Sequence, residues 1–201
     1  MTHVTPSPPG APPSNWNLPN ALTVLRIVMV PLFGWLLLSN GGDDIGWRLA
    51  AFGCFVAAMV TDRFDGEIAR RRGLVTTFGK VADPIADKAL TGSAFVGLSL
   101  LGELPWWVTV VVLGRELLVT LLRFVVIRYG VIAASRGGKL KTVLQTVALC
   151  AYILPVAGVT PLHLLAIGMM AAAVVVTVWT GGEYVVQAVR VWHEGRRGVR
   201  R

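Results

Sequence analysis

Long apolar runs separated by short polar connections are the feature of this sequence that most restricts its fold. A helix needs about 20 apolar residues to cross a bilayer, and no run here shows the alternating pattern of a strand. The sequence therefore predicts an all-α integral membrane bundle of six transmembrane helices. The first run starts at Asn20 and ends at the turn-forming residues 39–42, and the others cover 47–70, 79–101, 105–129, 140–157 and 161–192.

Composition agrees with a membrane protein. Of the 201 residues, 54% are hydrophobic and 15% are charged, and the mean hydropathy is +0.64. A chain of this size with that many spans has no room for a large soluble domain. The net charge of +8 is compatible with nucleic-acid binding, but in a membrane protein it is better explained by basic cytosolic loops and contact with anionic lipid or phosphate. We therefore expect membrane lipids and no nucleic acid among its partners.

Basic residues gather on alternate connections between the runs. Residues 70–80 carry four Lys or Arg, residues 128–141 carry four, and the C-terminal stretch from Arg190 carries five, whereas the other connections are nearly bare. Because Lys and Arg accumulate on the cytosolic side, this distribution predicts a multi-pass protein of the cell membrane with both termini in the cytosol.

The chain is predicted to consist of three segments. Residues 1–16 are rich in proline and are predicted to be a disordered cytosolic tail. Residues 17–192 form the predicted six-helix domain, and residues 193–201 form a basic cytosolic tail that suits anionic headgroups.

Four aspartates flank the connection between the second and third runs, at the cytosolic side. Asp62 and Asp65 are three residues apart and Asp83 and Asp87 are four apart, so each pair shares one face of its helix. A short connection makes the two helices antiparallel neighbours, which can bring all four carboxylates together. Carboxylates near hydrocarbon need a cation or a function. Since neither His nor Cys lies nearby, this group favours one or two Mg²⁺ or Mn²⁺ ions.

Neighbouring residues strengthen this interpretation. Gly66 and Gly79 are costly inside helices, but their bare backbone lets a bulky ligand approach. Arg70 lies two turns after Asp62 on the same face, where it suits an anionic group. A single aspartate is often a helix cap or half of an ion pair, and Asp83, which precedes a proline, fits a cap. That alternative explains neither the repeated spacing nor the glycines.

Residues 62–87 read DRFDGEIARRRGLVTTFGKVADPIAD and match the pattern D-x2-D-G-x2-A-R-x8-G-x3-D-x3-D at every fixed place. The fixed places are Asp62, Asp65, Gly66, Ala69, Arg70, Gly79, Asp83 and Asp87. This pattern resembles the signature of the CDP-alcohol phosphatidyltransferase family, integral membrane enzymes of phospholipid synthesis.

The resemblance implies a metal-dependent transfer of a phosphatidyl group from CDP-diacylglycerol to an alcohol, with release of CMP. By this resemblance, Asp62, Asp65 and Asp83 are metal ligands, and Asp87 is both the base and a metal ligand. The donor site is implied at Asp62, Gly66, Arg70 and Gly79. The resemblance also implies a homodimer. The distribution of basic residues predicts that the active site lies on the cytosolic side.

A second group of charged residues interrupts the fourth and fifth runs. Arg115 and Arg123 share a helix face, and Lys139 and Lys141 open the next run. Several cations facing a metal site favour an anionic acceptor, such as a phosphorylated alcohol. Arg115 alone is explained equally well by a structural ion pair with Glu116 or with an aspartate.

The stretches NLPNALTVLR, GRE and ASRGGKLKTVLQ resemble the phosphatidylglycerophosphate synthase branch of the family, and TDRFDG, DPIADK, LPWWVTV and GGKLKT resemble its actinobacterial members. The implied acceptor is sn-glycerol 3-phosphate. By this resemblance its phosphate is held by Arg115, Arg123, Lys139 and Lys141, and Thr142 and Gln145 are additional polar candidates.

Other functions stay open at this point. Within the family, the acceptor can instead be inositol phosphate or phosphatidylglycerol, the latter giving a cardiolipin synthase. An ion carrier predicts carboxylates deep in several spans, whereas here they gather at one end of two. A lipid-binding scaffold without chemistry predicts that Asp87 is dispensable. Glu183 and the neighbouring Gly181 and Gly182 are assigned to no site.

Overall fold

The computed structural model describes residues 18–72, 76–126, 136–154 and 160–198. Within these ranges all regular structure is helical, which confirms the all-α prediction. Each expected run corresponds to one α-helix, and the last helix continues beyond Trp192. The elements are α1 (Leu18–Leu38), the 3-10 turn η1 (Ser39–Gly42), α2 (Ile45–Arg72), α3 (Thr77–Leu100), α4 (Trp106–Val126), α5 (Arg136–Ile153) and α6 (Thr160–Gly198).

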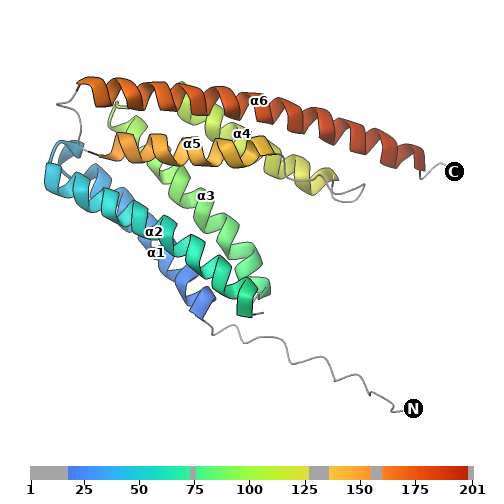
Figure 1. Cartoon of the computed structure of the whole chain (residues 1–201), viewed down its shortest axis with the longest axis horizontal. Helices are drawn as coiled ribbons and strands as arrows, with labels where there is room; N and C mark the ends of the chain where they lie inside the picture. Colours follow the sequence, from blue (N-terminus) through green and yellow to red (C-terminus); the bar gives the residue numbers. More distant parts are fainter. Residues whose placement is uncertain (1–17, 73–75, 127–135, 155–159, 199–201) are drawn as a thin grey trace, which may run out of the picture.

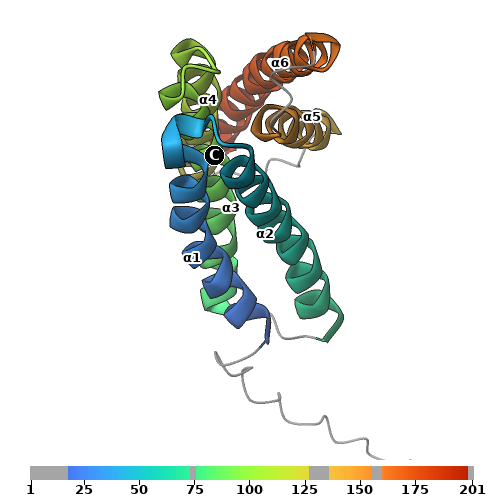
Figure 2. The same ribbon diagram turned by 90° about the vertical axis from the view of Figure 1, so that its left-hand side faces the viewer.

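The helices form two groups of three. In the first, α1 packs on α2 and α3, and in the second, α4 and α5 pack on α6. The groups meet where α2 and α3 contact α5 and where α3 contacts α4. Figure 1 shows them close together at the left-hand end, around the α1–α2 turn, with their axes diverging toward the other end. Figure 2, turned by 90°, shows the same separation into α1–α3 and α4–α6.

The turn between α1 and α2 depends on residues that tolerate a left-handed backbone. Asn40, Gly41 and Gly42 have φ values of 53°, 67° and 81°. A β-carbon on Gly42 would also lie 2.7 Å from the side chain of Leu101, at the end of α3. Glycine at this position therefore allows both the sharp reversal and the close contact with α3.

The apolar core fills the space where the helices meet. Phe33 of α1, Phe55 of α2, Phe95 of α3 and Leu149 of α5 are all almost fully buried. Gly97 brings α1 close to α3, because a β-carbon there would lie 2.7 Å from Leu37. Many large apolar side chains point outward instead, which is the arrangement expected of helices surrounded by lipid.

Three stretches in the described part of the chain are long and apolar enough to cross a membrane. They are Asn20–Gly42, Ile45–Asp62 and Pro161–His193. The other helices carry charged residues inside their apolar sequence, such as Asp87 on α3, Glu116 on α4 and Lys141 on α5. These findings support a membrane protein, while the count of six spans stays a prediction.

Candidate functional site

Two side chains of α1 contact aspartates that are predicted to bind the metal. Arg26, whose side chain is fully buried in α1, forms an ion pair with Asp62 on α2, whose side chain is 42% exposed. Three residues before Arg26, the hydroxyl of Thr23 donates to Oδ1 of Asp83 on α3 at 2.6 Å. Sequence reasoning assigned no role to Arg26 or Thr23. The available signal was Arg26 itself, a charge inside an apolar run that needs an anionic partner.

The start of α3 is fixed by Thr76 and Asn20. Thr76 caps the helix by accepting from the backbone N–H of Gly79 at 3.0 Å, and its hydroxyl donates to Oδ1 of Asn20 at 2.8 Å. Asp83 lies inside α3, so it is not the N-cap of this helix. A β-carbon on Gly79 would lie 3.1 Å from Asn20 Oδ1 and 3.8 Å from Asp83 Oδ2. Gly79 therefore has a packing role in the wall beside Asp83, and its contact with the donor stays a prediction.

Asp87 lies one helical turn after Asp83. It lines one cavity with Glu116 on α4 and Lys141 on α5, so it lies beside one of the predicted acceptor cations. This places Asp87 where the two predicted groups of charged residues meet.

The donor chemistry of the aspartates fits a hard divalent cation. Asp62 on α2 and Asp83 and Asp87 on α3 offer only carboxylate oxygens. Within the described side chains, however, no three His, Cys, Asp or Glu residues form a metal-binding group. The side chains of Asp65 and Arg70 and the surroundings of Gly66 are outside what the structure describes, so the four-carboxylate site stays a prediction.

Glu116 connects two of the predicted acceptor cations. Its Oε1 accepts from Lys141 on α5 and from Nη1 of Arg115 at 3.0 Å. Nη2 of Arg115 donates to the hydroxyl of Thr180 on α6, also at 3.0 Å. The ion pair with Glu116 that the sequence left open for Arg115 is therefore present.

Gly181 and Gly182 differ in their surroundings. A β-carbon on Gly181 would lie 3.0 Å from Cγ of Arg115, whereas one on Gly182 would meet nothing within 4 Å. Gly181 thus allows α4 and α6 to approach each other around Arg115, and Gly182 has no such packing requirement.

A small cavity lies between the two helix groups. It has a volume of about 90 Å³ and is lined by Met59, Asp87, Lys88, Thr91, Val112, Leu113, Glu116, Lys141, Thr142, Gln145 and Thr146. The cavity brings Asp87 together with Lys141, Thr142 and Gln145, all of which the sequence singled out. The side-chain amide of Gln145 donates to the hydroxyl of Thr177 on α6 at 3.0 Å. Lys88 also lines this cavity, although sequence reasoning did not select it.

The other predicted acceptor residues lie elsewhere. Arg123 is exposed near the end of α4, and its Nε donates to the hydroxyl of Tyr184 at 3.4 Å. Lys139 is exposed in the first turn of α5. Of the four predicted cations, only Lys141 is among the described residues that line the cavity, and Arg115 reaches it through Glu116.

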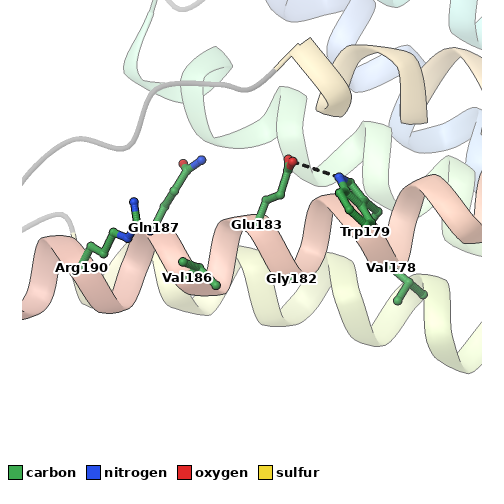
Figure 3. Close-up of a pocket in the computed structure, with 7 residues that line it drawn as sticks. All are labelled: Val178, Trp179, Gly182, Glu183, Val186, Gln187 and Arg190. Carbon is green, nitrogen blue, oxygen red and sulfur yellow. Dashed lines mark hydrogen bonds between the residues drawn. The ribbon is translucent and has the colours of Figure 1, made fainter.

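A larger and more open depression runs along α6, and all its described lining residues come from that helix (Figure 3). Within it the indole N–H of Trp179 donates to Oε1 of Glu183 at 2.9 Å. Glu183 lies about 33 Å along the helix from Pro161. It is not among the described residues that line the small cavity.

Comparisons with known proteins cover most of the chain. The family model described as CDP-alcohol phosphatidyltransferase matches residues 16–179. A probable phosphatidylglycerophosphate synthase of Mycobacterium tuberculosis is 56% identical over 174 residues, which is 87% of this chain and 82% of that protein. A CDP-diacylglycerol–glycerol-3-phosphate 3-phosphatidyltransferase of Bacillus subtilis is 40% identical over 149 residues, or 69% of this chain and 77% of that protein.

A cardiolipin synthase (CMP-forming) of Streptomyces coelicolor is 35% identical over 116 residues, covering 56% of this chain and 53% of that protein. The family match includes the whole aspartate motif at residues 62–87 and all the described lining residues of the cavity. The chain therefore belongs to the CDP-alcohol phosphatidyltransferase family.

Proposed function

We propose that this protein transfers a phosphatidyl group from CDP-diacylglycerol to sn-glycerol 3-phosphate, which yields phosphatidylglycerol phosphate and CMP. The observation that carries the proposal is the cavity in which Asp87 lies with Lys141. It combines a carboxylate suited to accept a hydroxyl proton with a cation suited to hold a phosphate. The names of the Mycobacterium and Bacillus relatives support the same acceptor.

The reaction is a single displacement at phosphorus. The acceptor hydroxyl oxygen forms a bond to the phosphorus that carries diacylglycerol, while Asp87 takes the hydroxyl proton. The bond from that phosphorus to the bridging oxygen of CMP breaks, and CMP leaves. Asp62, Asp65, Asp83 and Asp87 would hold one or two Mg²⁺ or Mn²⁺ ions, which when bound neutralise charge on the diphosphate.

The surrounding residues hold this machinery in position. Arg26 and Thr23 on α1 orient Asp62 and Asp83, so α1 fixes one carboxylate on each of the two helices that carry the motif. By the family resemblance, Gly66, Arg70 and Gly79 complete the donor site together with Asp62.

The proposed setting is a six-span homodimer in the cell membrane with both termini and the active site in the cytosol. The N-terminal tail covers residues 1–16, the six-helix domain 17–192 and the basic tail 193–201. The length of α6 suits a span that continues beyond the bilayer, because 39 residues extend about 58 Å, well beyond a hydrocarbon layer of about 30 Å.

The structure favours the enzyme over an ion carrier. A carrier needs a polar path from one side of the membrane to the other. Along α2, between Arg48 near one end and Asp62 near the other, the inward-facing Ala51, Phe55 and Ala58 are at most 1% exposed and apolar. The charges on this helix therefore belong to separate sites rather than to one path.

The test measures CMP release by the purified protein with CDP-diacylglycerol and Mg²⁺. We expect turnover with glycerol 3-phosphate and little with inositol phosphate or phosphatidylglycerol. A preference for either of the latter would overturn the acceptor assignment, and no CMP with any acceptor would overturn the enzymatic proposal. Chelation should abolish CMP release and added Mg²⁺ or Mn²⁺ should restore it, whereas full turnover with chelator present would contradict metal dependence.

A further inference from the structure

We propose that Lys88 is a phosphate-binding residue of the acceptor site and forms, with Lys141, a pair of lysines that hold the acceptor phosphate from two helices. The inference rests on the proposed function, because it concerns the phosphate of the same acceptor. It adds a residue that neither the aspartate motif nor the basic segments of the sequence singled out.

Lys88 is held in place from α4. It directly follows Asp87 on α3, and its ammonium group donates to the hydroxyl of Thr120. That hydroxyl in turn donates to the backbone carbonyl of Glu116 at 2.7 Å. The end of the Lys88 side chain is therefore fixed one helical turn away from Glu116, which lines the same cavity.

Lys141 reaches the cavity from the other helix group. It is 5% exposed on α5, and its ammonium group donates to the carboxylate of Glu116. Lys88 on α3 and Lys141 on α5 line the same cavity, one from each helix group. An anion bound between them is stabilised by both charges.

The charges around the cavity favour a phosphate monoester at Lys88. Glu116 already interacts with Lys141 and Arg115, and Asp87 is needed for the hydroxyl proton. Among the described residues, the hydrogen-bond partner of Lys88 is a neutral hydroxyl, so its charge remains available to a ligand. A phosphate monoester carries about 1.5 to 2 negative charges near pH 7, which suits two lysines better than one.

The positions of Asp87 and Lys88 on α3 suit an acceptor that carries both a hydroxyl and a phosphate. Asp87 and Lys88 are adjacent in sequence and line the same cavity. An acceptor whose hydroxyl lies at Asp87 therefore has the first lysine beside its reacting end and Lys141 across the cavity. A short alcohol with a phosphate a few bonds from the hydroxyl can contact all three residues at once.

The test compares Lys88→Gln with the full-length wild-type enzyme in detergent micelles. We expect KM for glycerol 3-phosphate to rise about ten- to a hundredfold, the effect of losing one hydrogen bond to a charged group. The inhibition constant of inorganic phosphate, measured as a competitor of glycerol 3-phosphate, should rise in parallel. KM for CDP-diacylglycerol should stay within about twofold, and Lys88→Arg should recover most of the affinity because it keeps the charge.

Arg190→Gln is the matched control, because Arg190 is an exposed cation on α6 that does not line the cavity. Its kinetic constants should equal those of the wild type. If Lys88→Gln folds poorly, Thr120→Val tests the same contact, since it releases Lys88 without removing its charge, and KM for glycerol 3-phosphate should then rise about threefold.

Unchanged constants for glycerol 3-phosphate and phosphate in an active Lys88→Gln enzyme would overturn the inference and leave the proposed function standing. A loss of kcat with both constants unchanged would overturn it as well, because that result assigns Lys88 a role other than phosphate binding. A wild-type enzyme that releases no CMP with glycerol 3-phosphate would instead overturn the proposed function.

Discussion

Arg48 and Lys141 are both buried cations held by a glutamate, but their surroundings differ. Arg48, near the start of α2, uses Nη1 and Nη2 to bind both carboxylate oxygens of Glu103 at 2.5 and 2.8 Å. Nε and Nη2 also donate to the carbonyls of Ile153 and Tyr152 at the end of α5. Lys141 shares one oxygen of Glu116 with Arg115 and lies beside a cavity.

The two ion pairs lie at opposite ends of α5. Lys141 and Tyr152 are about 16 Å apart along the helix axis. The Arg48 pair joins α2, the α3–α4 connection and α5, and every nitrogen of its guanidinium has a protein partner. The Lys141 pair leaves room for a ligand. A buried ion pair in which every nitrogen has a protein partner thus indicates a structural role, whereas a shared pair beside a cavity indicates ligand binding.

The largest expected effect is on kcat and comes from a substitution in the cavity that Lys141 lines. Asp87→Asn keeps the size of the side chain but removes the base, so kcat should fall about 10²- to 10⁴-fold. Because Asp87 is exposed, the midpoint of thermal unfolding should stay close to that of the wild type. CMP release and circular dichroism in detergent measure the two quantities. Substantial remaining turnover would show that another group accepts the proton.

The next largest effect is on stability and comes from the ion pair of Arg48 with Glu103. Arg48→Met should lower the free energy of unfolding by about 2 kcal/mol. This loss is smaller than is usual for breaking a fully buried ion pair, because the side chain of Glu103 is 33% exposed. Thermal unfolding in detergent measures this change, and kcat of the folded enzyme at low temperature should be unchanged. Arg48→Lys, which keeps the charge but loses the two-pronged contact, should lie in between. A large loss of kcat without a loss of stability would contradict the structural role assigned to Arg48.

The smallest effect concerns the contact of Arg115 with α6. Gly181→Ala should displace Arg115 and raise KM for glycerol 3-phosphate about two- to fivefold, because the new β-carbon meets Arg115 Cγ. Gly182→Ala is the matched control, because its β-carbon meets nothing within 4 Å. Alanine favours the helical state over glycine, so the free energy of unfolding should rise by about 0.5 to 1 kcal/mol. Equal kinetic constants for the two variants would show that the position of Arg115 does not affect the acceptor site.

Features that depend on local sequence were predicted well. The apolar runs located the six α-helices found in the described part of the chain, because helix formation in a bilayer depends on the length and composition of each segment. The turn after Leu38 is also a local feature, because its Asn and Gly residues favour a left-handed backbone. The helical spacing of Asp83 and Asp87 placed both on α3, and the cavity then brought Asp87 together with Lys141.

Features that depend on which helices are neighbours were not predicted. Arg115 and Arg123 do share a helix face, but that face meets Thr180 and Tyr184 of α6, whereas both were expected to hold the acceptor phosphate. Helical spacing defines a face without defining what it contacts. The contacts of α1 with Asp62 and Asp83 were missed for the same reason, because they join residues 36 and 60 positions apart.

The Arg48 pair also joins the two helix groups. The groups lie close together at that end and diverge toward the other (Figure 1). Because Arg48 on α2 donates to the carbonyls of Tyr152 and Ile153 on α5, it cross-links the groups about three helical turns along α5 from Lys141. The cross-link and the acceptor cavity are therefore separate places on the same helix, and each can be altered by substitution without removing a contact of the other.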